Sequence, residues 1–341
     1  MTYSNNTATE ITNAAPGKYD DASPDALALS QVCKAASDPL RLDILRVLQS
    51  ESFGVLELCH IFELAQPKLS HHLKVLANAG LVNTRRDGNS IFYRRPLLNM
   101  ENTLALFIQH LFYSIDTLPL GASAESRIES IKNTRALSSL DFFEKNADRF
   151  REKQALVIEN SQYFDNVSEL VLLANLPASA TIVEIGPGEG DYLLELSKQF
   201  AQVYAIDNSR PMLELAEMNA VKSGVKNIQF IHSTAGATET QHIKADLAVC
   251  NMVLHHVPSP KTLVKNIAGM LNSSGFMLVS ELCHHDQQWV QDTCGDLWLG
   301  FEPNELEHWA ETAGLQKCHR LFLGQRNGFQ VQIHLFKKLS N

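Results

Sequence analysis

The stretch from Thr181 to Asp191, TIVEIGPGEGD, decides the fold of the larger part of this chain. A short β-branched run leads into a glycine-rich turn, and the helical pattern YLLELSKQF (192–200) follows directly. Glycines at 186, 188 and 190 let the backbone approach a ligand that a Cβ atom would exclude. The stretch therefore predicts a strand, a ligand-binding turn and a helix N-terminus, in that order.

Apolar runs and helical segments alternate after this motif. Six runs follow it, namely VYAID (203–207), IQFIH (228–232), DLAVCN (246–251), GFMLVSEL (275–282), CHRLFLG (318–324) and FQVQIHLF (329–336). Helical patterns separate the first four of them. This alternation predicts a doubly wound α/β domain with a largely parallel sheet.

Two carboxylates are candidates for binding a ligand at the glycine turn. Glu184 lies two positions before the first glycine, and Asp207 ends the next apolar run, 23 positions after Glu184. An acid at that second position is placed to accept both hydroxyls of a ribose. The glycine turn alone would also suit a dinucleotide. Glu184, however, would repel a pyrophosphate and suits the amino-acid end of S-adenosylmethionine (SAM), so the pair favours SAM.

Charge is distributed unevenly along the chain. The net charge of the 341 residues is −9, yet residues 41–95 hold eight basic side chains against five acidic ones. A basic segment in an acidic chain suggests a local nucleic-acid contact. The composition, with 45% hydrophobic and 20% charged residues, excludes a mainly disordered, collagen-like or coiled-coil chain. Six scattered cysteines without a CxxC pair indicate reduced thiols in a cytoplasmic protein.

The basic segment predicts a helix-turn-helix followed by a hairpin. A short helix at 55–63 precedes a second one at 66–80, whose leucines at i, i+4 and i+7 form one buried stripe. The segment 81–95 (LVNTRRDGNSIFYRR) predicts a basic hairpin, a wing, around Asp87-Gly88. Its arginines alone could be a solvated face, but beside the helix pair they favour DNA. The residues expected at the DNA are Gln66, Lys68, Ser70, His71, Lys74, Arg85, Arg86 and Arg94.

These segments resemble the ArsR family of winged-helix regulators, in SDPLRLDILRVL (37–48), LSHHLKVLANAGLV (69–82) and RRDGNSIFYR (85–94). The resemblance implies a homodimer on an inverted repeat of double-stranded DNA. Only Cys59 remains of the paired cysteines of arsenic-sensing members, so a three-thiolate site is not expected. After the wing, an apolar stripe is formed by Leu97, Met100, Leu104, Phe107 and Leu111. Its spacing suits packing against a partner helix, or alternatively packing within its own domain.

The C-terminal part resembles class I SAM-dependent methyltransferases of Rossmann-like fold across most of residues 141–341, including DLAVCNMVLHHV (246–257) and SSGF (273–276). By position, the resemblance implies a cofactor site made of Glu184, Gly186, Gly188, Gly190, Asp207, Met212, Thr234 and Asn251. Many members of this family have an Asp near the position of Thr234, and that Asp binds the amino group of adenine. In this chain the Thr234 hydroxyl or the backbone would have to recognise the adenine ring.

No metal site is expected. The most suggestive string, Cys283-His284-His285-Asp286, consists of adjacent residues that point in different directions. The pair His255-His256 suggests a general base at most.

A winged helix ahead of a methyltransferase-like domain suggests a ligand sensor. The strings at 281–301 and 324–336 resemble SahR-like regulators, which implies a repressor of methionine–SAM cycle genes that responds to S-adenosylhomocysteine (SAH). The alternative is an active small-molecule methyltransferase that also regulates its own gene; arsenical methylation is a third and weaker one.

The residues do not indicate whether SAM or SAH is preferred, what the operator is or which sign the ligand effect has. We expect a disordered tail at 1–24, a DNA-binding and dimerisation domain at 25–118, a linker at 119–140, and a SAM- or SAH-binding domain at 141–341, with no membrane segment.

Overall fold

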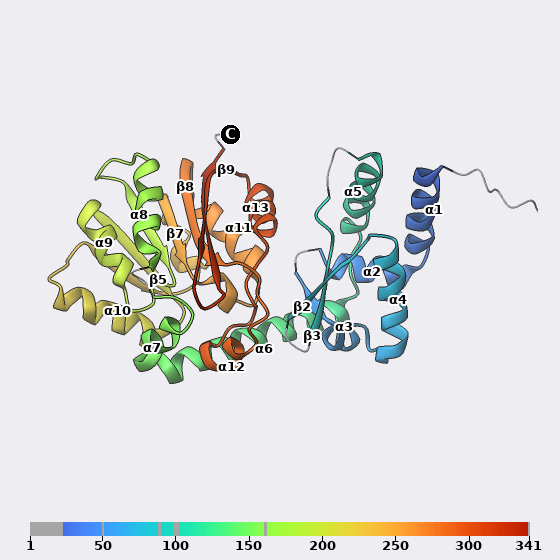
Figure 1. Ribbon diagram of the computed structural model, residues 1–341, viewed down its shortest axis with the longest axis horizontal. Coiled ribbons are helices and arrows are strands. Elements are labelled where there is room, and N and C mark those ends of the chain that lie inside the picture. Colours follow the sequence, from blue (N-terminus) through green and yellow to red (C-terminus); the bar gives the residue numbers. More distant parts are fainter. Residues whose placement is uncertain (1–22, 50, 88–89, 99–101, 160–161, 340–341) are drawn as a thin grey trace, which may run out of the picture.

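The computed structural model describes residues 23–49, 51–87, 90–98, 102–159 and 162–339. Two bodies lie next to each other, and one long helix runs along the lower edge of both (Figure 1). The tail expected at 1–24 lies outside the described residues except for Ser23 and Pro24. Ser23 already belongs to the fold, because its side chain accepts a hydrogen bond from the Ala26 amide and caps the first helix.

The N-terminal body is a winged helix-turn-helix with its own core. Its elements are α1 (Pro24–Ala36), α2 (Pro39–Val47), β1 (Phe53–Gly54), α3 (Val55–Phe62), α4 (Gln66–Asn78), β2 (Asn83–Asp87), β3 (Ser90–Arg94) and α5 (Thr103–Asp116). Asp38 caps α2 by accepting from the Arg41 amide at 3.1 Å, and Pro39 occupies the first turn. The buried leucine stripe of α4 packs into the core, as predicted. Gly80 follows α4 with a φ of 69°.

The C-terminal body is a doubly wound α/β domain. Its strands are β4 (Thr181–Ile185), β5 (Gln202–Asp207), β6 (Ile228–His232), β7 (Ala245–Asn251), β8 (Leu271–Leu282), β9 (Leu315–Gly324) and β10 (Gln330–Lys338). The sheet order is β6-β5-β4-β7-β8-β10-β9, with parallel pairing from β6 to β8 and antiparallel pairing of β10 with both its neighbours. All seven predicted strands and the predicted Rossmann-like fold are confirmed.

Helices cover both faces of this sheet (Figure 1). The helices are α8 (Phe164–Leu173), α9 (Asp191–Gln199), α10 (Arg210–Lys222), α11 (Pro260–Met270), α12 (Trp289–Cys294) and α13 (Pro303–Thr312). One buried cluster joins the sheet to α8, α9 and α10, and a second joins its other face to α11 and α13. Strand β4 lies between β5 and β7, so the chain winds in opposite directions from it. Ligands of open α/β sheets bind beyond the carboxyl ends of such strands.

The segment expected as a linker, 119–140, lies mostly within the 25-residue helix α6 (Ala122–Asn146). A 3₁₀ turn, η1 (Ala147–Arg149), and a short helix, α7 (Phe150–Ala155), follow it. Ala124, Ile128 and Ile131 of α6 pack against the core of the winged helix. Farther along, α6 packs against α10 of the other body. Its weak amphipathic pattern follows from this, because successive parts contact different neighbours.

Candidate functional site

A cavity of about 280 Å³ lies beyond the carboxyl ends of β4 and β5. We call it the main cavity. Gly186 and Gly188 of the glycine turn, Asp207 and Met212 line it, as does Thr234 after β6. Its volume is near the lower end of the range for small-molecule sites. Five of the eight predicted cofactor residues thus come together around one space.

The three glycines of the turn have positive φ angles, between 59° and 84°. A Cβ atom at Gly186 would approach Val253 to 2.6 Å, and one at Gly188 would approach Phe150 to 3.1 Å. Gly190 does not line the cavity. It precedes α9 and lets that helix lie against Ala216 of α10, where a Cβ atom would be 3.2 Å away.

Asp207 presents a carboxylate at the edge of the main cavity. One oxygen accepts a hydrogen bond from the Ser209 amide at 2.7 Å. Burial raises the pKa of Asp207 to about 6, although the Ser209 hydrogen bond opposes the rise. Near neutral pH the group is ionised and can accept from two neighbouring hydroxyl groups.

Glu184 and Asn251 border a smaller space of about 40 Å³, the side recess. Glu184 is 1% exposed; its Oε1 accepts from Asn251 Nδ2 at 3.2 Å, while its Oε2 has no hydrogen-bond partner among the described residues. Burial raises the pKa of Glu184 to about 8. An unpaired buried carboxylate oxygen is costly, and a ligand ammonium group would satisfy it. Gly186 and Gly188 line both spaces, so one elongated ligand can reach from Asp207 to Glu184.

Helix α6 also lines the main cavity, a contribution that the sequence analysis missed. Ala136, Ser139 and Phe143 come from α6, and Phe150 comes from α7. Residues so far from the glycine motif carry no local signal for this role. The one hint is the Phe142-Phe143 pair in an otherwise polar stretch.

A third space, the inner recess, has a volume of only about 20 Å³. Phe150 and Met252 line it together with the other two spaces. His255 and His256 line it too, and His255 Nδ1 lies 2.5 Å from Glu281 Oε1. Such a volume accommodates about one water molecule and no larger acceptor substrate.

The predicted DNA-binding residues of α4 lie on its outer face. Gln66, Lys68, His71 and Lys74 are exposed, and Ser70 is half-buried. Leucines hold the opposite side of α4 in the core. The helix therefore presents polar and basic groups of the kind that contact base edges and phosphates.

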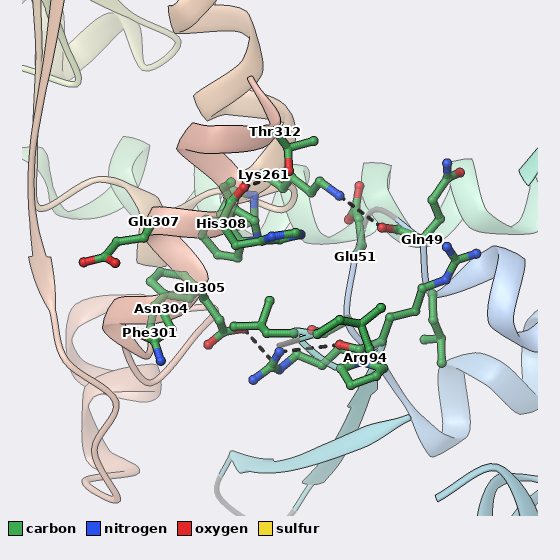
Figure 2. A pocket seen from close by; sticks show the side chains of 18 of the residues that line it. Gln49, Glu51, Arg94, Lys261, Phe301, Asn304, Glu305, Glu307, His308 and Thr312 are labelled. Atoms are coloured by element: carbon green, nitrogen blue, oxygen red, sulfur yellow. Dashed lines mark hydrogen bonds and ion pairs between the residues drawn. The ribbon is translucent and has the colours of Figure 1, made fainter. Parts of the chain in front are cut away.

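The wing differs from the prediction. Arg86 is exposed, but Arg85 and Arg94 face the C-terminal body, where Glu305 of α13 lies 3.5 Å from Arg85 and 3.3 Å from Arg94. Figure 2 includes Arg94 and Glu305 at the cavity of about 750 Å³ between the bodies. The expectation that Arg85 and Arg94 face DNA is thus not met in this arrangement, because buried carboxylates bind both guanidinium groups.

Asp87 extends this contact. It accepts from Arg85 at 3.0 Å, and its Oδ1 lies 3.5 Å from His284 Nε2. Arg85, Asp87 and Arg94 with His284 and Glu305 are called the wing contact below. The two bodies also meet where Ser259 donates to Glu51 at 2.7 Å. Lys261 donates to the Gln49 carbonyl at 3.1 Å (Figure 2).

The apolar stripe that was expected to contact a partner helix is partly buried and partly exposed in the described residues. Met100 lies outside the described residues, Leu104 and Leu111 are half-buried, and Phe107 is 40% exposed. The adjacent stripe of α5 packs in its own domain, through Ala105, Ile108, Phe112 and Ile115. Exposed apolar side chains remain at Leu106, Phe107 and Tyr113.

Two families match this chain. Residues 150–321 match the methyltransferase domain family, and residues 38–84 match the bacterial regulatory protein family arsR. A ubiquinone biosynthesis O-methyltransferase of Serratia proteamaculans (strain 568) is 24% identical over 157 residues, which are 42% of this chain and 65% of that protein. A second, from Xanthomonas axonopodis pv. citri (strain 306), is 26% identical over 41% of this chain and 64% of its own. The chain thus spans just under two thirds of these relatives.

Among solved structures, magnesium protoporphyrin IX methyltransferase from Synechocystis PCC 6803 is similar with a TM-score of 0.50 and 19% identity, covering 60% of this chain and 99% of its own. That likeness concerns the fold. Within the described ranges, no helix combines the length and apolar character needed to cross a membrane. The chain belongs to the methyltransferase domain family and carries an arsR-family regulatory module ahead of that domain.

Proposed function

We propose that this protein is a DNA-binding transcriptional repressor whose affinity for DNA is controlled by SAH or SAM bound in the main cavity. The observation that carries the proposal is the double role of α6. The same helix lines the cavity and holds the winged helix, so occupancy of one body can be transmitted to the other. An effector acts only through unequal affinity for two conformations, and a hundredfold effect on DNA binding needs about 2.7 kcal/mol of difference.

The chemistry of the cavity supports an adenosylated sulfur ligand. Asp207 suits the ribose hydroxyls, and the unpartnered oxygen of Glu184 suits the ammonium group of the amino-acid end. The Synechocystis methyltransferase of similar fold was solved with bound SAH. Thr234, Met212 and Asn208 border the part of the cavity left for the adenine ring.

Arg135 supports transmission along α6. Its guanidinium contacts both carboxylate oxygens of Glu57 in α3, at 3.0 and 2.6 Å, and lies 4.8 Å from the ring of Trp298 in the C-terminal body. The next residue, Ala136, lines the main cavity. Helix α3 packs directly on α4, so a shift of α6 reaches the helix that we assign to DNA.

The wing contact is the part of the proposed mechanism that changes DNA affinity. While Glu305 binds Arg85 and Arg94, those arginines are withheld from phosphate. A ligand that changes the position of α6 relative to α13 would change how readily the wing contact opens. We infer that α4 provides constant DNA contacts and that Arg85 and Arg94 provide the regulated ones.

Methionine–SAM cycle genes are the proposed targets, and a homodimer on an inverted repeat is the proposed binding form. Exposed Leu106, Phe107 and Tyr113 on α5 offer an apolar surface for the partner. Size-exclusion chromatography with light scattering, together with selection of bound duplexes from a random pool, tests both points. A monomer on DNA, or a selected site without two-fold symmetry, would contradict them.

The sensing proposal is tested by fluorescence anisotropy on the selected duplex with SAH, SAM or adenosine. We expect SAH or SAM to change the dissociation constant at least about tenfold, which requires about 1.4 kcal/mol. Asp207→Ala should abolish the change while DNA binding without ligand persists. Equal DNA affinity with and without saturating SAH and SAM would refute sensing.

An active methyltransferase is the second candidate, favoured by the match to the methyltransferase domain family. The inner recess does not support it, because a volume of about 20 Å³ holds no acceptor substrate larger than a water molecule. Transfer of a tritiated methyl group from SAM to a metabolite extract, abolished in Asp207→Ala, would favour catalysis. Absence of transfer with retained SAM binding would favour sensing.

A further inference from the structure

Three side chains that can ligate metals converge at the inner recess. His255 and His256 belong to the 3₁₀ turn η4 (Leu254–His256), and Asp296 follows α12. One ligand atom from each lies within 4.8 Å of the others. Asp296 is 5% exposed, and neither of its carboxylate oxygens has a hydrogen-bond partner in the described part of the chain. A buried carboxylate with both oxygens unpaired needs a cationic partner.

Glu281 of β8 orients one of these imidazoles. Its Oε1 lies 2.5 Å from His255 Nδ1, and its carboxylate also accepts from the amides of His255 at 3.2 Å and Leu282 at 2.6 Å. When a neutral imidazole donates from Nδ1 to a carboxylate, the lone pair is on Nε2. A carboxylate–histidine pair of this kind typically positions a metal-ligating imidazole.

The spacing suits a small cation. Ligand atoms on a four-coordinate zinc ion lie roughly 3.3 Å apart at bond lengths of about 2.0–2.2 Å. His256 Nδ1 lies 3.7 Å from Asp296 Oδ1, too far for a hydrogen bond and close to that separation. The same nitrogen lies 3.3 Å from the Gly295 carbonyl, a weak hydrogen bond that an ion bound at Nδ1 would replace. The recess leaves about 20 Å³ beside these groups, room for about one small ion or one water molecule.

We propose that His255, His256 and Asp296 bind a divalent transition-metal ion of the zinc class, with Glu281 positioning His255. Two imidazoles and one carboxylate select zinc, cobalt or ferrous iron over magnesium and calcium, which prefer oxygen ligands throughout. This replaces the expectation that the chain holds no metal. The cysteine–histidine string at 283–286 is not part of the site, since His284 contacts Asp87 and His285 packs on Phe329.

The site adjoins both the main cavity and α6. His256 lines the main cavity, and its ring meets Phe143 of α6 at 4.8 Å between centroids. Phe150 and Met252 line all three spaces, so the sulfur of a ligand that spans the main cavity and the side recess would lie beside the inner recess. A dication there would oppose the sulfonium of SAM and tolerate the neutral thioether of SAH. This selectivity rests on the proposed function; the metal site does not.

Metal binding is tested on the full chain after chelation, by equilibrium dialysis with Zn²⁺ and by the visible absorption of bound Co²⁺. We expect one ion per chain, bound at least about tenfold more weakly by Asp296→Asn and His256→Gln, and about 10–100-fold more weakly by Glu281→Gln. Asp292→Asn is the matched control, because this exposed carboxylate lies on α12, only four positions before Asp296. Circular dichroism and melting curves verify folding.

Two outcomes would overturn the site. One is no stoichiometric Zn²⁺ or Co²⁺ binding by the chelated protein. The other is binding that Asp296→Asn and Asp292→Asn weaken equally, which would assign the ion to the surface. The selectivity is read separately by calorimetry, where Zn²⁺ should raise the ratio of SAH to SAM affinity at least about fivefold, by roughly 1 kcal/mol. An unchanged ratio refutes the selectivity alone, and failure of both ligands to bind refutes the proposed function alone.

Discussion

Helix α4 and the wing carry the same kind of charge but are used differently. Lys68 and Lys74 of α4 are exposed, whereas Arg85 and Arg94 of the wing are bound by Glu305. Helix α4 packs on α1, α2 and α3 of its own domain, whereas the wing contacts both domains. The difference teaches that one DNA-binding domain can combine contacts that are always available with contacts whose availability depends on a neighbouring domain.

The largest effect is expected from α4. Lys68→Ala with Lys74→Ala should weaken DNA binding about 100-fold and lower the slope of its salt dependence by about one for each phosphate that is no longer neutralised, with or without ligand. Anisotropy titrations over a range of salt concentrations measure both quantities. The double variant of Lys145 and Lys198, two exposed lysines away from the winged helix, is the control. Weakening that occurs only with ligand would erase the distinction between α4 and the wing.

Loss of the contact between α6 and α3 should make the DNA contacts of the wing independent of ligand, as we expect those of α4 to be. Arg135→Gln removes the paired hydrogen bonds to Glu57. We expect the ligand effect on the DNA dissociation constant to shrink about tenfold, the size of a coupling energy of 1–2 kcal/mol, with ligand affinity unchanged in calorimetry. Arg149→Gln, which removes an exposed arginine paired with Glu152, should leave the effect intact. A full response in Arg135→Gln would show that transmission bypasses this residue.

Releasing the wing should strengthen DNA binding. Glu305→Gln removes the charge that holds Arg85 and Arg94. We expect ligand-free DNA affinity to rise at least about fivefold, because breaking a buried ion pair costs more than the roughly 1 kcal/mol of an exposed pair. Replacing Glu311, which is exposed on the same helix, by Gln serves as the control. The increase should vanish when Arg85 and Arg94 are also replaced by Ala. If Glu305→Gln leaves affinity unchanged, the wing contact does not compete with DNA.

The smallest effect concerns pH. The nearby carboxylate of Asp87 raises the pKa of His284, while burial and the charge of Arg85 oppose the rise. His284 therefore stabilises the wing contact fully below its ordinary pKa of about 6.5, and this contribution disappears as the pH rises through the raised pKa. We expect up to about threefold tighter DNA binding near pH 8 than near pH 6, beyond any change in His284→Gln. An equal pH dependence in both proteins would remove His284 from the wing contact.

Much of the fold was predictable because its signals are local. The strand, turn and helix at 181–200 required no knowledge of distant residues, since apolar periodicity and glycines specify them. The leucine stripe of α4 was predictable for the same reason. Of the proposed cofactor residues, five line the main cavity and Glu184 and Asn251 line the side recess, since parallel strands bring their carboxyl ends to one edge. Gly190 was predicted at the ligand and instead lets two helices approach each other.

The partners of individual side chains were less predictable. Whether Arg85 faces DNA or Glu305 depends on a helix more than 200 positions away, and no spacing within 81–95 encodes it. Phe143 and Ala136 were missed at the cavity because α6 reaches it from outside the α/β pattern. His255 and His256 were noted as a pair, but Asp296 joins them only through the packing of the segment after α12.

The amino-acid order alone determined that a basic winged helix precedes a glycine-turn α/β domain, because periodicity, caps and turn residues act over a few positions. Only the tertiary structure decided which charges remain open to solvent, which helix borders the cavity and which buried carboxylate lacks a partner. Those properties arise from contacts between segments that are remote in the chain. Their energies depend on distance and burial in three dimensions, which linear spacing does not specify.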